Sequence, residues 1–249
     1  MKKKRIIGVI TIKDNIAVQS FSYKKYLPLG NPEKLAKNLN DWGADEILIN
    51  VIDSTKNLSK PDYKILEKIA SSEISTPIIF GGGIQKLDHA IRIINSGADR
   101  ILCDSLFVKN SDEIKKISHA LGSQAVILSL PIILKKEIMR YDYLSKKTNK
   151  LNSNFFELFK KNYISELLIT DVENEGTLDG FNLNILKKIK FDDINTILFG
   201  GLYSVKKLEK IFKKKNVNAI AIGNALNYKE NSIHLLKSSS LSKYFREDY

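Results

Sequence analysis

The stretch that decides the fold is residues 45–53, DEILINVID, because it recurs as SELLITDVE at residues 165–173. Two further pairs keep nearly the same offset of about 120 residues: FGGG at 80–83 matches FGGL at 199–202, and ADRILCDS at 98–105 matches VNAIAIGN at 217–224. A strand, a glycine turn and another strand thus repeat at constant spacing over half the chain. This repeat predicts a doubled half-barrel.

Outward from this repeat, short β-branched runs alternate with amphipathic stretches about ten residues long. The expected strands are 5–12, 46–51, 77–80, 100–103, 125–130, 166–170, 196–199 and 219–222. The expected helices are 32–42, 63–71, 87–96, 111–120, 154–161, 183–190, 205–214 and 233–238. The strand runs are apolar without alternation, which is typical of a parallel sheet buried on both faces.

Eight strand–helix units in 249 residues predict a single (β/α)8 TIM barrel over residues 1–249. Its half-barrels would span about 1–120 and 121–240. A doubly wound open sheet is the alternative, but such sheets usually have fewer strands.

The composition, 43% hydrophobic and 27% charged, is ordinary for a soluble globular protein. The lone cysteine, Cys103, excludes a disulfide within the chain and a thiolate metal site, and we expect no metal and no cofactor. The opening MKKKRIIGVI imitates a signal peptide, but Lys13-Asp14 interrupts the apolar run and no small-residue cleavage site follows. We expect a cytoplasmic protein that does not enter the membrane.

The net charge of +12 raises the question of nucleic-acid binding. Only five of the 40 basic residues are arginines, whereas base readout and bidentate phosphate contacts favour arginine over lysine. The lysines are scattered over amphipathic segments, as on a solvated surface. Nucleic acid is therefore not an expected partner.

Two glycine-rich turns follow expected strands at the end of the barrel where active sites form. Glycine lets backbone amides approach a phosphate, although the glycines could also serve only to turn the chain tightly. The candidate phosphate-binding residues are Gly82, Gly83 and Ser105 in the first half, and Gly176, Thr177, Gly201, Gly223 and Asn224 in the second. Because the carboxylate of Asp104 would repel a phosphate, we expect the stronger anion site in the second half.

The chain resembles the cyclase subunit of imidazole glycerol phosphate synthase, which joins ammonia from a glutaminase to a sugar-phosphate nucleotide in histidine biosynthesis. The motifs that carry this resemblance run from the first strand to the last. They are KRII at 4–7, KD at 13–14, GGGI at 81–84, GAD at 97–99, GSQAV at 122–126, SxK at 145–147, EGTxxGF at 175–181 and GG at 200–201.

The departures from the family pattern fall on its acid–base residues. The resemblance implies two catalytic aspartates, but their positions hold Thr11 and Pro131, neither of which exchanges protons near neutral pH. The position that usually holds a lysine in the family holds Gln19 here, and the position that usually holds an asparagine holds Asp104. Asp14 is kept but lies beyond the first strand, and the open alternative is that Asp53 or Asp171 has taken over. The catalytic residues are thus unknown.

The resemblance also implies a ring of four charged residues at the opposite barrel end, where ammonia enters from the glutaminase. The matching positions are Arg5, Glu46, Arg100 and Glu166, and we expect these residues to lie within salt-bridge distance of one another. A purely structural ring is the alternative, although apolar residues would serve stability as well without a desolvation cost. Asp99 matches a residue that faces the glutaminase.

A chain that keeps the charged ring but lacks the two aspartates resembles a divergent branch of cyclase-like barrels, which is associated with amidation of surface-polysaccharide sugars. This resemblance implies a synthase subunit that pairs with a glutaminase and a separate amidating enzyme. It would conduct ammonia toward acetamidino modification of a phosphorylated or nucleotide-linked sugar. Whether the chain has catalytic activity of its own stays open. The alternatives are a histidine-pathway cyclase with a displaced acid–base pair, and a non-catalytic binding scaffold.

Overall fold

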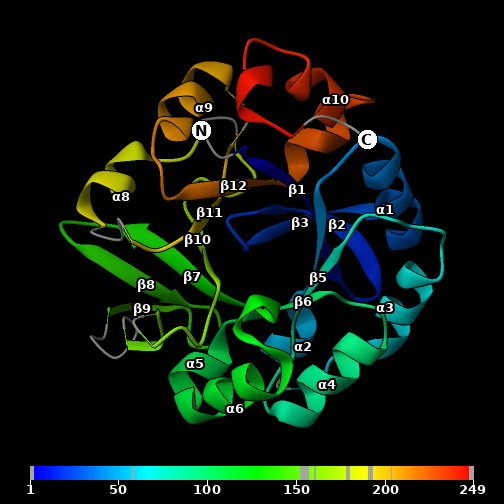
Figure 1. Cartoon of the computed structure of the whole chain (residues 1–249), viewed down its shortest axis with the longest axis vertical. Helices are drawn as coiled ribbons and strands as arrows, with labels where there is room; N and C mark the ends of the chain where they lie inside the picture. The colour runs from blue at the N-terminus through cyan, green and yellow to red at the C-terminus, as the bar shows by residue number, and fades with distance from the viewer. Residues whose placement is uncertain are drawn as a thin grey trace.

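The structure is a computed structural model that describes residues 3–57, 59–151, 157–159, 161–177, 180–189, 193–202 and 204–246. Within this part, eight parallel strands close into a barrel (Figure 1). They are β1 (Arg5–Lys13), β4 (Glu46–Val51), β5 (Ile78–Gly81), β6 (Arg100–Cys103), β7 (Val126–Leu134), β10 (Glu166–Asp171), β11 (Thr196–Phe199) and β12 (Val217–Ile222). Since β1 pairs in parallel with both β12 and β4, the ring closes. The fold is the predicted (β/α)8 barrel.

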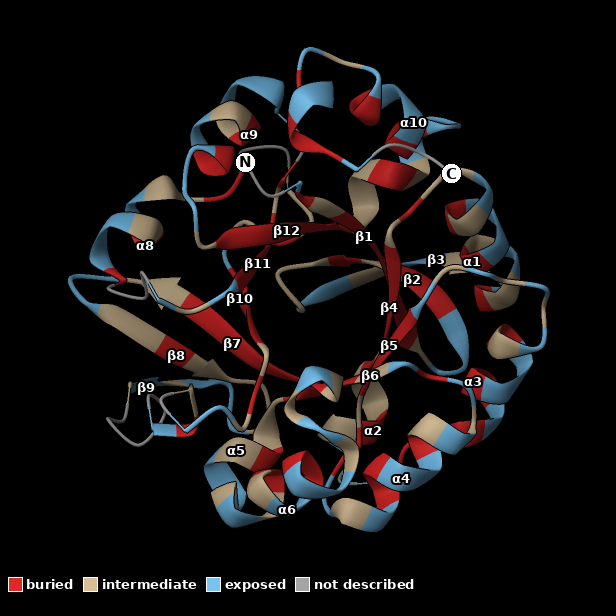
Figure 2. Cartoon of the chain, viewed as in Figure 1, coloured by how far each residue is buried: buried red, intermediate tan, exposed pale blue. Residues whose placement is uncertain are grey.

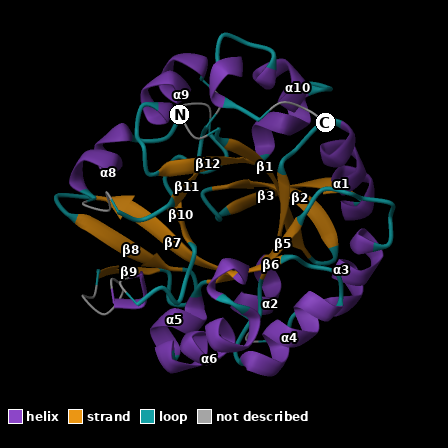
Figure 3. Ribbon diagram, in the orientation of Figure 1, coloured by secondary structure: helices purple, strands orange, loops and turns teal. Residues whose placement is uncertain are grey.

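The helices surround this ring of strands (Figure 3). They are α1 (Pro32–Asp41), α2 (Ile52–Lys56), α3 (Tyr63–Ala70), α4 (Leu87–Asn95), α5 (Ser105–Lys109), α6 (Ser111–Leu121), α8 (Leu183–Lys188), α9 (Val205–Phe212) and α10 (Ser232–Lys237). Short 3-10 turns lie at Ser123–Ala125, Asn224–Tyr228 and Ser242–Tyr244. Half of the expected helix 154–161 lies outside the described residues, and residues 157–159 within it are helical. No helix in the described part is long and apolar enough to cross a bilayer.

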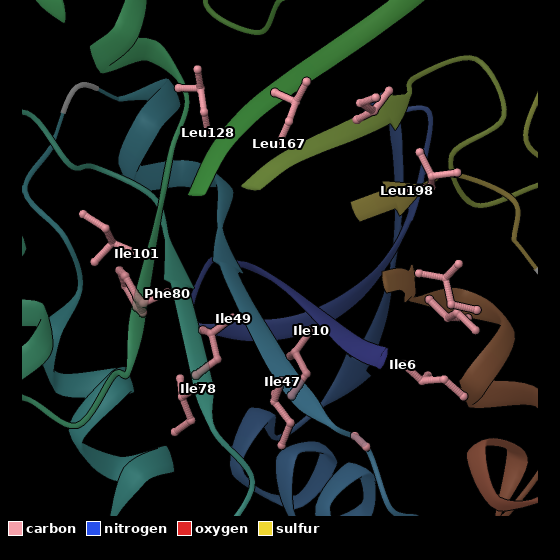
Figure 4. Packing of buried hydrophobic residues seen from close by; sticks show 14 of the residues in the cluster. Ile6, Ile10, Ile47, Ile49, Ile78, Phe80, Ile101, Leu128, Leu167 and Leu198 are labelled. Carbon is pink, nitrogen blue, oxygen red and sulfur yellow. The ribbon is translucent and has the colours of Figure 1, made fainter. Parts of the chain in front are cut away.

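The barrel strands are buried on both faces because their side chains alternate between two apolar layers (Figure 2). The outer layer packs under the helices and includes Ile47, Ile49 and Phe80 (Figure 4). The inner layer fills the barrel and includes Ile7, Leu48, Ile79, Leu102, Ile127, Leu168 and Ile197. This double burial explains the unbroken apolar runs in the sequence.

Two antiparallel hairpins extend from the barrel and correct the sequence interpretation. Residues 13–30 lie between the first expected strand and the first expected helix, where no strand was predicted, but they form β2 (Ile16–Phe21) and β3 (Lys25–Gly30), and β2 pairs with β1. On the other half, β8 (Ile138–Asp142) and β9 (Lys147–Lys150) continue from β7. These strands are four to six residues long, and polar residues, or Pro28 in β3, interrupt their apolar side chains, so they lack the apolar run by which the barrel strands were predicted.

Candidate functional site

A cavity of about 910 Å³ opens at the carboxyl ends of the barrel strands. The first-half residues predicted to bind phosphate, Gly82, Gly83 and Ser105, all line it. Gly82 has φ +123°, and a Cβ there would lie 2.2 Å from the carbonyl oxygen of Val51. Only glycine therefore fits this turn, which keeps the backbone open to the cavity.

The second-half residues are brought together in a much smaller space. Gly176, Thr177, Gly201, Gly223 and Asn224 border a void of about 20 Å³, which is room for about one water. The β2–β3 hairpin packs against them: the Asn224 side-chain amide donates to the Ser20 carbonyl at 2.7 Å, and the Ser20 backbone N–H donates to Asn224 Oδ1 at 3.2 Å. The space beside the first-half candidates is thus larger than the space beside the second-half candidates, while the predicted order of anion affinity stays a prediction.

Glu175 connects the hairpin to the second-half loops, a role that the sequence did not reveal. Its carboxylate accepts the Ser20 hydroxyl at 2.9 Å and the Tyr23 backbone N–H at 3.2 Å. The side chain is buried, and this burial raises the pKa of Glu175 to about 7. The hairpin therefore rests on a carboxyl group that titrates near neutral pH.

Asp104 is the one carboxylate among the described residues that line the large cavity. Arg140 Nη2, from β8, donates to Asp104 Oδ1 at 2.9 Å. Burial raises the pKa of Asp104 to about 6, although the charge of Arg140 opposes this shift. The expectation that Asp104 repels an anion did not include Arg140, which offsets its charge. Only the tertiary fold brings these two residues together.

The charged ring lies at the other end of the barrel, and its four side chains contact one another as predicted. Arg5 pairs with Glu46 at 2.9 Å and also with Glu166. Arg100 pairs with Glu46 at 3.1 Å and with Glu166 at 2.8 Å. Each arginine thus lies between the two glutamates, which closes the ring.

The ring is buried but incompletely hydrogen-bonded. Its side chains are 7–13% exposed. Burial by itself would raise the pKa of Glu166, but the hydrogen bond from Arg5 and both arginine charges hold this pKa below its usual value. Oε2 of Glu46 and Oε2 of Glu166 accept no hydrogen bond, so their contacts with arginine are ionic only. Two of the four contacts are therefore ion pairs without hydrogen-bond geometry.

Asp99 lies exposed at this same end, where β6 begins. One of its carboxylate oxygens accepts the backbone N–H of Ile78 at 2.8 Å, which ties β5 to β6. In the same way, a carboxylate oxygen of Asp45 accepts the backbone N–H of Ile6 at 2.7 Å, which ties β1 to β4. Asp99 thus has a structural role in addition to the predicted partner contact.

The sequence profile of the family described as "Histidine biosynthesis protein" matches residues 5–232. The chain belongs to this family. It is 28% identical over 235 residues to the putative imidazole glycerol phosphate synthase subunit hisF2 of Vibrio vulnificus, covering 93% of this chain and 86% of the relative. It is 27% identical to a putative HisF subunit of Leptospira borgpetersenii, covering 92% of each chain. It is 28% identical to the HisF subunit of Staphylococcus aureus strain MRSA252, covering 96% of each.

For this member of the histidine biosynthesis family, the positions of the two implied aspartates lie outside the cavity. Thr11 is 6% exposed, and its register partners are Val18 and Asn50. Pro131 is buried opposite Thr170. Neither lines the 910 Å³ space.

The carboxylates considered as replacements do not line the cavity either. Asp53 accepts the backbone N–H of Asp14 at the exposed end of β1. Asp171 is buried and accepts the Asn174 side-chain amide at 2.7 Å and the Asn182 backbone N–H at 2.8 Å. Gln19 lies on β2 opposite Leu27, within the hairpin. Asp104 is therefore the better candidate for acid–base chemistry in the cavity.

Proposed function

We propose that this histidine biosynthesis family member is the barrel subunit of a glutamine amidotransferase complex. A glutaminase docks on the face that carries the charged ring, and its ammonia passes through the barrel to the 910 Å³ cavity. The observation that carries this proposal is the closed four-residue ring at one end of an apolar barrel interior. Apolar side chains would stabilise that end at lower desolvation cost, so a function other than stability explains the charges.

The acceptor is a nucleotide-linked sugar that receives an acetamidino group, with a separate amidating enzyme activating it. Two observations support this acceptor over the histidine-pathway substrate. The implied aspartate positions are Thr11 and Pro131, and neither these residues nor Asp53 or Asp171 lines the cavity.

The second candidate function is that of an imidazole glycerol phosphate synthase cyclase subunit. The relatives reported above carry that name over nearly their whole length, which favours it. In this case Asp104, with a pKa of about 6, would act as the proton-exchanging group.

The experiment is a stoichiometry measurement in the reconstituted complex. Glutamine consumed and aminated product formed are measured with the glutaminase, the amidating enzyme and a nucleotide-sugar acceptor, and in parallel with the histidine-pathway substrate. The intact complex gives a ratio near one. The Arg5→Ala variant leaves Glu46 and Glu166 with Arg100 alone, so ammonia leaks and the ratio rises severalfold while glutamine hydrolysis continues.

The matched control is Lys86→Ala, which removes an exposed ion pair with Asp88 far from the ring. Its ratio stays near one. A ratio that also stays near one in Arg5→Ala, in a folded protein, would reduce the ring to a structural feature and contradict the proposal.

A further inference from the structure

The mouth of the 910 Å³ cavity is unusually rich in tyrosine. Tyr23 and Tyr26 come from the β2–β3 hairpin, while Tyr141 and Tyr143 come from β8 and the turn after it, and all four line the cavity. The rings of Tyr23 and Tyr143 meet edge to face at 4.8 Å, and those of Tyr141 and Tyr143 at 5.4 Å. Two hairpins from opposite halves of the chain thus form one aromatic cluster over the cavity.

The backbone holds Tyr23 in this cluster at a conformational cost. The turn from Phe21 to Lys24 is closed by a backbone hydrogen bond of 3.0 Å, and its central residues Ser22 and Tyr23 have φ of +52° and +54°. Such turns favour asparagine and glycine, and a bulky residue with positive φ is rare. Backbone strain of this kind persists only where the surroundings fix it, and it clusters at ligand sites.

The rim of the cavity is cationic. Lys24, Lys135, Lys146 and Lys147 line it with exposed side chains. The carboxylate of Asp104 is paired with Arg140 and does not cancel these charges. The phenols do not add negative charge either, because burial raises the pKa of Tyr26 to about 12 and those of Tyr23 and Tyr143 well above their ordinary value. The site therefore favours a ligand with more than one negative charge.

The size and the walls of the cavity call for more than an inorganic anion. A volume of about 910 Å³ lies at the upper end of the roughly 300–1,000 Å³ range of small-molecule sites. Leu48, Leu102 and Leu168 form an apolar floor, and the glycine turn at 81–83 lines the wall. Aromatic rings beside lysines are the combination that binds a stacked base next to its phosphates.

We propose that this cavity binds a nucleoside diphosphate group, with its base packed against Tyr23, Tyr141 and Tyr143 and its diphosphate held by the rim lysines. This inference deepens the proposed function, since it identifies the part of a nucleotide-linked acceptor that the barrel recognises. The tyrosine cluster supplies affinity for the base, whereas the lysines supply affinity for the phosphates. These two contributions can be separated by mutation.

The experiment is a calorimetric titration of the intact chain with UDP, with CDP, GDP and ADP as alternative bases, and with pyrophosphate and uridine as partial ligands. UDP or another of these nucleotides binds at least about tenfold more tightly than pyrophosphate. Tyr143→Leu, and independently Tyr141→Leu, weakens nucleotide binding about tenfold, consistent with loss of base stacking, and changes pyrophosphate binding less than twofold. Lys147→Ala weakens binding of both ligands.

The matched controls are Tyr163→Leu, whose ring contacts His119 outside the cavity, and Lys115→Ala on the outer face of α6. Both keep wild-type affinities. Equal affinity for nucleotides and pyrophosphate, equal losses of both in the tyrosine variants, or no nucleotide binding at all would overturn the inference. Because these titrations need no glutaminase, a failure here combined with a raised glutamine ratio in Arg5→Ala would reject the nucleotide site and leave the ammonia path standing.

Discussion

At the residue scale, Glu175 shows how tertiary contacts change the chemistry of one side chain. The sequence places it in the motif EGT at 175–177, next to the candidate phosphate ligands Gly176 and Thr177. In the fold it is 2% exposed beneath the β2–β3 hairpin, and burial raises its pKa from 4.5 to about 7. Its protonation state is therefore linked to the stability of the fold.

We expect the free energy of unfolding to fall as the pH rises from about 4.5 to about 7. A carboxyl group with a raised pKa in the folded state stabilises the fold fully below its unfolded pKa, and this stabilisation is lost as the pH passes the folded pKa. For Glu175 the loss is about 3 kcal/mol by the conversion of pKa shift to free energy. Urea unfolding of wild type and Glu175→Gln across pH 4.5–8.5 measures it.

In Glu175→Gln the hydrogen bond from Ser20 can be kept, but no proton is gained or lost, so the pH slope flattens. The exposed Glu230→Gln variant serves as control and keeps the wild-type slope. An unchanged slope in Glu175→Gln would show that this carboxyl group is already ionised in the folded protein.

At the element scale, the two hairpins cover the barrel mouth, and one glycine determines how the β2–β3 hairpin docks. Gly176 has φ +77°, and a Cβ there would lie 1.9 Å from the Ser20 carbonyl oxygen of β2. Gly30, at the end of β3, also has a positive φ, +113°, but a Cβ there would meet nothing within 4 Å. Substitutions at these two glycines therefore distinguish the cost of backbone strain, which both share, from the cost of a steric clash, which only Gly176 has.

We expect Gly176→Ala to destabilise the protein more than Gly30→Ala by roughly 1–3 kcal/mol, which is the usual cost of overpacking. Both variants place an alanine at a positive φ, which strains the backbone, but only Gly176→Ala also pushes the hairpin away from the second-half loops. Urea unfolding gives the difference, and limited proteolysis within 13–30 reports whether the hairpin has detached. Equal losses of stability, with no new cleavage, would mean that the hairpin does not depend on this contact.

The hairpins also mark the limit of sequence interpretation at this scale. The strands at 46–51, 100–103 and 196–199 were predicted to the residue because each is a short, mostly apolar run between helical patterns. The sequence does not reveal the strands β2, β3, β8 and β9, because their apolar runs are short or interrupted. Their order comes from pairing: β2 and β8 pair with the ends of β1 and β7, and β3 and β9 pair with β2 and β8. Strand pairing is not visible in local composition.

At the scale of the whole molecule, the closed barrel places the charged ring and the large cavity at opposite ends. The charged ring lies at the amino ends of the strands, and the cavity lies at their carboxyl ends, with the inner apolar layer between them. The acid–base residues implied for histidine-pathway chemistry are absent at Thr11 and Pro131. The molecule thus keeps the charged ring, while the implied catalytic pair is replaced.

We expect the purified chain, given ammonia and the histidine-pathway substrate, to form no imidazole ring. The physical reason is that neither a threonine hydroxyl nor a proline exchanges protons near neutral pH, so general acid–base assistance is lost at both positions. Absorbance or chromatographic detection of the product measures this, with a cyclase subunit that has both aspartates as positive control. Turnover of about 1 s⁻¹ or faster would favour the second candidate function.

The four charged residues of the ring were implied by the resemblance to the cyclase family, whereas the sequence pattern by itself determined the barrel and the order of its strands. It could do so because apolar runs, helical periodicity and a 120-residue repeat are local or regularly spaced signals. Only the tertiary structure decided which groups meet at the mouth: Asp104 with Arg140, Ser20 with Glu175 and Asn224, and Tyr23 with Tyr143. These contacts join hairpins to distant loops across up to 204 residues of chain. Their formation depends on barrel closure and strand pairing, which no stretch of sequence specifies alone.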